Sequence, residues 1–183
     1  MKFVPQAIPD VIVVEPDLHR DGRGLFLETY HARKYREGGI APTFVQDNRS
    51  RSVRGTLRGL HAQESRPQGK LLQVVSGEIF DVAVDLRRDS PTFLHWVGVV
   101  LSDANARQCW VPPGFAHGFY VLSETADVEY KCTDFYDPSD ELRIAWDDPE
   151  IGVKWPLAGP PSLSPKDRDA RAAREQLERL PRS

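Results

Sequence analysis

The chain has 183 residues, 40% of them hydrophobic, and a formal net charge of -3. This length supports one sizeable core, so we expect a single domain over residues 1–183. The net charge is too small to indicate a general nucleic-acid or membrane-binding surface. The two cysteines, the lack of a signal-peptide-like apolar run at the start and the lack of an apolar stretch near the ~20 residues of a membrane span indicate a cytoplasmic protein.

Short runs of β-branched and aromatic residues recur along the chain, separated by Gly, Pro, Asp and Asn. They predict strands at residues 11–15, 24–30, 44–52, 70–75, 79–86, 95–101, 108–111, 119–122 and 128–133. The clearest alternation, within 79–86, gives one apolar and one mostly polar face. Helical pattern is limited to 31–37 and to a C-terminal surface helix expected at about 165–180. Many short strands at regular spacing favour a sandwich or a barrel.

Two segments match the motifs of cupins, which are small double-stranded β-barrels that hold a metal ion. In the first motif, a His-x-His pair is followed by a Glu seven residues before a Gly. Here His61 keeps the first position, but Gln63 replaces the second His and Lys70 replaces the Glu. The second motif, Pro-x-Gly-x-x-His, is intact at residues 112–117. Because an ammonium group repels a divalent cation, the sequence predicts a cupin barrel without a metal site.

Six blocks of sequence, two of which overlap the cupin motifs, carry a more specific likeness, at residues 21–30, 44–50, 58–63, 114–119, 130–132 and 163–167. With these blocks the chain resembles the dTDP-4-dehydrorhamnose 3,5-epimerase family. The resemblance implies an all-β cupin jelly-roll barrel with a few short peripheral helices. It also implies cofactor-independent epimerisation of dTDP-4-keto-6-deoxyglucose, in which protons on both sides of the 4-keto group are removed and returned to the opposite face of the ring.

His61 and Lys70 suit two of the roles that such a reaction needs. An imidazole, with an unperturbed pKa of about 6.5, is a competent base near neutral pH, although a structural histidine is the alternative. A cation at Lys70 would stabilise the enolate oxygen. A solvated surface lysine is the alternative, but strand alternation places Lys70 on one face with Leu72 and Val74.

Tyr130 and Asp167 take the remaining roles by resemblance. Tyr130 would return the proton from the other face, and a buried structural tyrosine is the alternative. Asp167 would orient His61 and stabilise its imidazolium. The segment 164–167 also has the pattern of a helix start, with Ser164 as the cap.

Substrate-binding residues are likewise assigned by resemblance, apart from the general fitness of Arg for phosphate. Arg58 and Arg23 would bind the diphosphate, whereas the other arginines of 49–58 are expected on a solvated face. Phe26 would stack on the thymine, and the base and sugar would meet Glu28, Gln46 and Asn48. His117, Glu141 and Lys166 would complete the rim of the pocket.

The resemblance also implies a homodimer in which the segment 23–28 crosses to complete the partner's site. Three alternatives to a 3,5-epimerase stay open. One is a mono-epimerase of an antibiotic deoxysugar pathway that inverts only C3 or C5. The others are a metal-dependent cupin, disfavoured by Gln63 and Lys70, and a non-catalytic barrel that only binds a sugar nucleotide.

Overall fold

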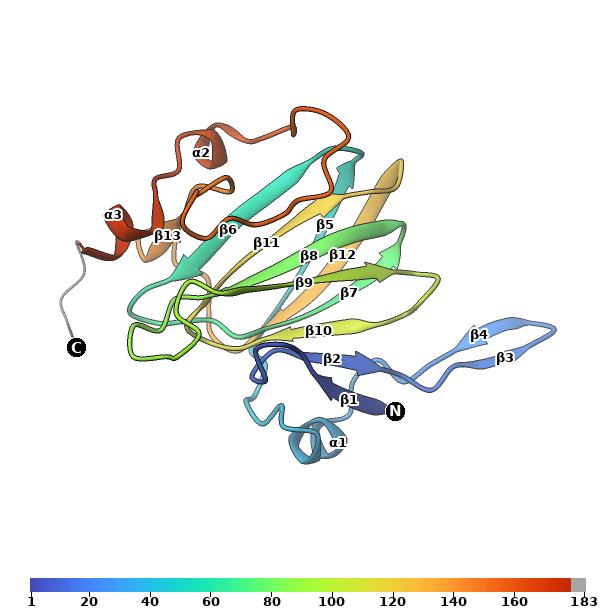
Figure 1. The fold of residues 1–183 in the computed structure, drawn as a ribbon. Helices are drawn as coiled ribbons and strands as arrows, with labels where there is room; N and C mark the ends of the chain where they lie inside the picture. Colours follow the sequence, from blue (N-terminus) through green and yellow to red (C-terminus); the bar gives the residue numbers. More distant parts are fainter. Residues whose placement is uncertain (179–183) are drawn as a thin grey trace.

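Two antiparallel sheets lie face to face in the computed structural model, which describes residues 1–178 (Figure 1). The larger sheet contains β1 (Lys2–Pro5), β2 (Ile12–Glu15), β10 (Gln108–Val111), β7 (Lys70–Ser76), β12 (Thr125–Cys132) and β5 (Gln46–Val53), in that order. The smaller sheet contains β13 (Glu141–Arg143), β6 (Leu57–Gln63), β11 (Phe115–Val121), β8 (Glu78–Asp85) and β9 (Trp96–Ser102). The predicted all-β jelly-roll class is confirmed.

Peripheral elements complete the chain. Strands β3 (His19–Asp21) and β4 (Gly24–Phe26) form a separate hairpin that projects away from the two sheets (Figure 1). The helices are α1 (Ala32–Glu37), α2 (Pro165–Arg168) and α3 (Ala173–Glu178).

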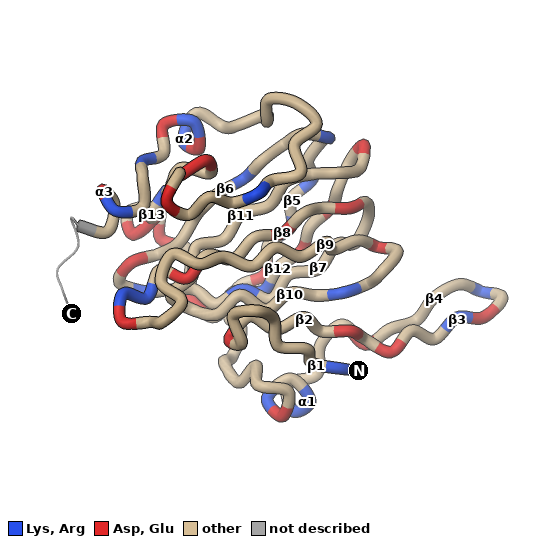
Figure 2. The backbone as a smooth tube through the Cα atoms, in the orientation of Figure 1, with Lys and Arg blue, Asp and Glu red and all other residues tan. Residues whose placement is uncertain are grey.

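No helix of residues 1–178 has the length and apolar character that would let it span a membrane. Lys and Arg are interspersed with Asp and Glu over these elements (Figure 2).

Apolar side chains are buried on both faces of both sheets. Between the sheets, Leu72 and Val128 of the larger sheet pack with Phe119 of the smaller sheet. The outer face of the smaller sheet is covered by the C-terminal segment, and that of the larger sheet by α1 and its flanking loops. This double burial explains the alternation in β8. Its apolar residues Val82 and Val84 face outward under the C-terminal segment, while the polar Asp81 points into the barrel.

Several predicted strands differ from the observed ones. The predicted strand 24–30 ends at Phe26, where the hairpin closes and the chain returns to the body. Strand β6 was missed because its polar residues interrupt the apolar pattern, although both of its faces are largely buried. The short edge or hairpin strands β1, β3 and β13 were also missed.

The prediction of one C-terminal surface helix at 165–180 was wrong. Helices α2 and α3 are separated at residues 169–172, because the backbone there bonds to β13 and to the residues just after it. The Arg171 N–H donates to the Arg143 carbonyl at 3.4 Å, and the Arg171 carbonyl accepts from Ala145 N at 2.7 Å. The Asp148 carboxylate then accepts from Ala173 N at 2.7 Å and starts α3. Helix α3 is not a surface element throughout, since Ala173 and Leu177 are buried. Residues 179 and 180 of the predicted helix lie outside the described residues.

Candidate active site

A cavity of about 380 Å³ lies between the two sheets. Ten of the predicted site residues line it: His61, Lys70, Tyr130, Asp167, Gln46, Asn48, Arg58, His117, Glu141 and Lys166. The larger sheet contributes through β5, β7 and β12, the smaller sheet through β6, β11 and β13, and α2 closes one side. The fold therefore brings together four residues that are up to 106 positions apart in the sequence and that were predicted to act in catalysis.

His61 on β6 is held by Asp167 on α2. Its Nε2 lies 2.5 Å from Asp167 Oδ1, so the ring donates to the carboxylate there and leaves Nδ1 for other partners. The His61 side chain is 22% exposed and that of Asp167 only 3%. Burial opposes ionisation of Asp167, but hydrogen bonds from His61 and Ser164 outweigh it, so the pKa of Asp167 lies below its ordinary value. The pair can hold a proton on the ring as an imidazolium beside a carboxylate.

Both sequence interpretations of the segment 164–167 describe real contacts. Ser164 Oγ accepts from the backbone N–H of Asp167 at 3.2 Å, as a helix N-cap does. The Asp167 carboxylate is not used for capping and instead faces His61. Ser164 therefore starts α2, and this short turn carries the carboxylate to the cavity.

Lys70 is the first residue of β7 and faces the cavity on the side that also presents Leu72 and Val74 to the inner core. Burial lowers the pKa of Lys70 below its ordinary value, because a desolvated ammonium is less stable than the neutral amine. No carboxylate among residues 1–178 forms an ion pair with it. A cation placed in this way can interact with negative charge that develops on a bound molecule.

Tyr130 lies on β12, in the sheet opposite His61. Its ring packs against the inner core, and burial raises the pKa of its phenol above the ordinary value, with Cys132 nearby adding to the effect. The phenol therefore stays protonated near neutral pH and can act as a proton donor. His61 and Tyr130 approach the same cavity from opposite sheets.

His117 lines the cavity from a buried position in its wall. His117 lies on β11 directly opposite His61 on β6 and is only 7% exposed. Its Nε2 is 2.7 Å from Oδ1 of the buried Asp81, which was not among the predicted site residues. Asp81 was not predicted because the polar face of an alternating strand usually points to solvent. In β8 the polar face points into the barrel instead.

Glu141 and Lys166 do form a pair at the cavity. The Lys166 ammonium lies 2.8 and 3.1 Å from the two oxygens of the Glu141 carboxylate. Glu141 is 8% exposed at its side chain and Lys166 is 42% exposed, so the carboxylate lies inside and the ammonium lies at the mouth.

Alternation along β5 separates cavity residues from surface residues. Gln46 and Asn48 face the cavity and are hydrogen-bonded to each other at 3.0 Å. Arg49 and Arg51 face outward and pair with Asp127, as expected for a solvated face. Arg58 lines the cavity and donates only to a neutral partner among the described residues, Ser52 Oγ at 3.0 Å.

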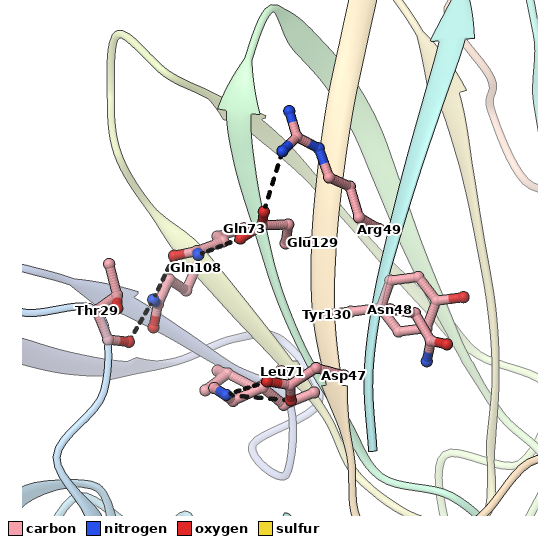
Figure 3. A pocket seen from close by; sticks show the side chains of 10 residues that line it. Thr29, Asp47, Asn48, Arg49, Leu71, Gln73, Gln108, Glu129 and Tyr130 are labelled. Carbon is pink, nitrogen blue, oxygen red and sulfur yellow. Dashed lines mark hydrogen bonds and ion pairs between the residues drawn. The ribbon is translucent and has the colours of Figure 1, made fainter.

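A second, smaller cavity of about 270 Å³ lies on the outer face of the larger sheet (Figure 3). It is lined by a polar chain in which Gln108 donates to the Thr29 carbonyl and to Gln73, and Gln73 donates to Glu129. Figure 3 shows that the side chain of Tyr130 points away from this chain, toward the barrel. Opposite charges are balanced in this second cavity, since Glu129 pairs with Arg49.

Three predicted binding residues do not reach the cavity of their own chain. Arg23, with a side chain that is 91% exposed, pairs with Asp21 at 2.7 Å. Phe26 is 70% exposed on the projecting hairpin. Glu28 pairs with Lys34 at 2.8 Å.

Tyr136 and Gln63 line the cavity but were not predicted as binding residues. Tyr136 lies in an irregular segment that no strand or helix pattern could flag, and its backbone N–H donates to Gln46 Oε1 at 2.9 Å. Gln63, at the position of the second cupin histidine, donates to the carbonyls of Arg66 and Phe135 and accepts from Asp137 N. This amide therefore anchors the loop that carries Tyr136.

The donor set around His61 does not fit a metal ion. Among residues 1–178, no group of three or more His, Cys, Asp or Glu side chains is arranged to hold one. His61 and His117 already have carboxylate partners, and the ammonium of Lys70 and the amide of Gln63 stand where metal ligands would be required.

Comparisons with known proteins agree on one family. Residues 5–175 match the model of dTDP-4-dehydrorhamnose 3,5-epimerase. The curated enzyme of that name from Pseudomonas aeruginosa is 56% identical over 173 residues, covering 94% of this chain and 96% of the relative. The crystal structure of a dTDP-6-deoxy-D-glucose-3,5-epimerase from Legionella pneumophila, in complex with dTDP-4-keto-L-rhamnose, is 50% identical with a TM-score of 0.94, and the match covers 100% of this chain and 98% of that one. A dTDP-4-dehydrorhamnose 3-epimerase from Streptomyces niveus is 40% identical over 172 residues, covering 93% of this chain and 83% of the relative.

Proposed function

The chain belongs to the dTDP-4-dehydrorhamnose 3,5-epimerase family, and we propose that it inverts C3 and C5 of dTDP-4-keto-6-deoxyglucose by cofactor-independent proton transfer. The product is dTDP-4-dehydrorhamnose, an intermediate of deoxysugar synthesis. The higher identity to the 3,5-epimerase of Pseudomonas aeruginosa, 56% against 40% for the 3-epimerase of Streptomyces niveus, favours inversion at both carbons over a mono-epimerase.

The main support for this mechanism is that the His61–Asp167 pair and the Tyr130 phenol face one cavity from opposite sheets. Inversion of a carbon requires that a proton leave one face of the ring and return to the other. We assign the base to His61, which takes the proton from the carbon beside the 4-keto group, while Asp167 stabilises the imidazolium. Tyr130 then donates its phenolic proton to the opposite face of the same carbon.

Between these two transfers the substrate is an enolate with negative charge on the former keto oxygen. We assign Lys70 to this oxygen, because its desolvated ammonium has no carboxylate partner among residues 1–178. After each inversion the imidazolium loses a proton to solvent and the tyrosinate gains one, so the two groups return to their starting forms. The substrate proton is thereby replaced by a solvent proton.

Recognition of the nucleotide is assigned to the residues at the mouth of the cavity. Arg58, without a carboxylate partner among the described residues, is suited to the diphosphate, and Gln46 and Asn48 to the sugar and base. His117, Glu141 and Lys166 would position the remainder of the substrate.

We further propose a homodimer in which the hairpin of β3 and β4 reaches the partner's cavity. The hairpin projects from the body (Figure 1). It exposes Leu25 and Phe26, and its Arg23 is 91% exposed and does not line the cavity of its own chain. Strand β5, which lines the cavity, is an edge strand of the larger sheet. Exposed apolar side chains and a free strand edge are both features that favour association. Arg23, Phe26 and Glu28 would then complete the nucleotide site of the partner.

A cytoplasmic location fits this assignment. Cys109 and Cys132 are both free and buried, as expected in a reducing compartment.

The test is NMR of dTDP-4-keto-6-deoxyglucose with the protein in deuterated water, which follows deuterium entry at C3 and C5 separately. A 3,5-epimerase incorporates deuterium at both carbons, and the His61→Ala variant does so at neither. Exchange at one carbon identifies a mono-epimerase. Saturable binding without exchange would mean that the barrel only binds the sugar nucleotide.

A further inference from the structure

Ser164 makes two contacts with Asp167, and only one of them belongs to helix capping. Its Oγ accepts from the Asp167 backbone N–H at 3.2 Å, which is the cap. The same hydroxyl donates to the Asp167 carboxylate, with Oγ 2.6 Å from Oδ2. A hydroxyl has one donor and two acceptor sites, so both bonds can form together.

These contacts divide the two carboxylate oxygens of Asp167 between two partners. Oδ1 faces His61 Nε2 at 2.5 Å, and Oδ2 receives the Ser164 hydroxyl. The carboxylate is 3% exposed, so water has little access to replace a lost donor. A short hydrogen bond to a buried charged group is both strong and directional.

Resting on the proposed function, we propose that Ser164 is a positioning residue for the reaction: its hydroxyl fixes the rotation of the Asp167 carboxylate so that Oδ1 stays directed at the His61 ring. Ser164 does not touch the reacting atoms in this role. It acts through Asp167. Two hydrogen bonds link the side chains of Ser164, Asp167 and His61, and so connect α2 and its N-cap to β6.

The Ser164 hydroxyl also tunes the charge of the pair. Its bond to the ionised carboxylate is one of the causes that lower the pKa of Asp167, after burial, which raises it, and the bond from His61. Without this donor the His61–Asp167 pair binds a proton more tightly and becomes protonated at a higher pH. The other titratable groups that line the cavity and share its field are Lys70, His117, Tyr130, Cys132, Tyr136, Glu141 and Lys166.

Three variants separate positioning from capping. Ser164→Asp keeps a strong N-cap but has no proton to donate to Asp167 when ionised and adds a second negative charge beside it. Ser164→Ala loses both contacts, and Ser164→Thr keeps both. Ser162→Ala, which changes an exposed serine two residues earlier, is the matched control.

The experiment measures kcat, KM and the pH profile of epimerisation, together with an NMR pH titration of the His61 ring nitrogens, which needs no substrate. We expect Ser164→Asp and Ser164→Ala to lower kcat about tenfold with little change in KM, and Ser164→Thr to recover most of that loss. The acid limb of the profile and the NMR midpoint both move to higher pH, by about half a unit or more. In an Asp167→Asn background, removal of the Ser164 hydroxyl costs little further activity, because it acts through the carboxylate.

A wild-type kcat and an unshifted NMR midpoint in Ser164→Asp would overturn the proposal and leave capping as the only role. A lower melting temperature with an unshifted midpoint in Ser164→Ala would have the same meaning. If the wild-type protein does not epimerise the substrate, the proposed function fails, while the NMR midpoints still decide whether Ser164 positions Asp167.

Discussion

His61 and His117 lie directly opposite each other on the antiparallel strands β6 and β11, and each ring is hydrogen-bonded to a different buried carboxylate. His61 pairs with Asp167 at 2.5 Å on the side of α2, and His117 pairs with Asp81 at 2.7 Å inside the barrel. The spacing of these two strands therefore determines where both imidazoles lie.

Gly118 permits the close approach of β6 and β11. A Cβ added at Gly118 would lie 2.7 Å from the Arg58 carbonyl oxygen and 3.1 Å from Leu60 Cδ2. Because the first of these atoms is backbone, we expect Gly118→Ala to push the strands apart, to lower the free energy of unfolding by about 1–3 kcal/mol and to reduce kcat. Urea unfolding and steady-state kinetics measure both effects.

Gly159→Ala is the matched control, because a Cβ there has no atom within 4 Å. It should change the free energy of unfolding by less than about 0.5 kcal/mol. Equal stability of the two alanine variants would show that the strands adjust freely.

The likeness of several sequence blocks was enough to predict the fold class and the convergence of His61, Lys70, Tyr130 and Asp167 on one cavity. Alternation alone placed Lys70 on the inner face with Leu72. The pairing of Asp81 with His117 could not be predicted from the sequence, because a polar residue in an alternating strand usually faces solvent and the two residues are 36 positions apart. Tyr136 escaped prediction because its segment has no periodic pattern.

The C-terminal helix was overpredicted for a related reason. Helical composition at residues 165–180 is a local property, whereas the break at 169–172 arises from backbone hydrogen bonds to a distant strand. The hairpin residues Arg23 and Phe26 are likewise placed by tertiary structure, which directs them away from the chain's own cavity.

We expect the stability of the protein at acid pH to depend on the ionised carboxylate of Asp85 and its hydrogen-bond donors. Burial opposes its ionisation, but hydrogen bonds from Arg87, Ser90 and Thr92 lower its pKa from 3.8 to about 2. A lowered pKa contributes stability that is fully present above pH 3.8 and is lost as the pH falls through about 2. Asp85→Asn should lower the free energy of unfolding at pH 7 by about 1–3 kcal/mol, because it removes a buried charged acceptor and leaves Arg87 with only the exposed Asp10 as an ion-pair partner among residues 1–178.

Urea unfolding between pH 7 and pH 2 measures this difference. The gap between the wild-type protein and Asp85→Asn should narrow below about pH 4, where the native carboxylate begins to lose its advantage. A gap that stays constant down to pH 2 would mean that the carboxylate charge does not stabilise the fold.

Lys70 is expected to act mainly in the transition state. Lys70→Met removes the cation beside the enolate oxygen and should lower kcat by about 10²–10³. Because burial lowers the pKa of Lys70, its ammonium deprotonates at a lower pH than an ordinary lysine. The ratio of wild-type to Lys70→Met rates should therefore fall as the pH rises, and a pH-independent ratio would argue against a role of the charge.

Subunit complementation tests the exchange of the hairpin. An Arg23→Ala/Phe26→Ala subunit keeps His61 but has a defective hairpin, and a His61→Ala subunit has the reverse. If the hairpin acts in the partner's cavity, refolding the two inactive variants together should restore about a quarter of wild-type activity, because half of the dimers then contain one intact site. No recovery in a mixture that forms heterodimers would place the hairpin's contribution, if any, within its own chain.

Tyr130→Phe tests most directly the claim that a base and an acid act from opposite sheets. Deuterium entry at C3 and C5 of dTDP-4-keto-6-deoxyglucose and the configuration of each carbon are followed by NMR in deuterated water. We expect the variant still to incorporate deuterium through His61, with the original configuration retained, while the rate of inversion falls by about 10² or more. Inversion at the wild-type rate in Tyr130→Phe would contradict the assignment of the acid to the larger sheet.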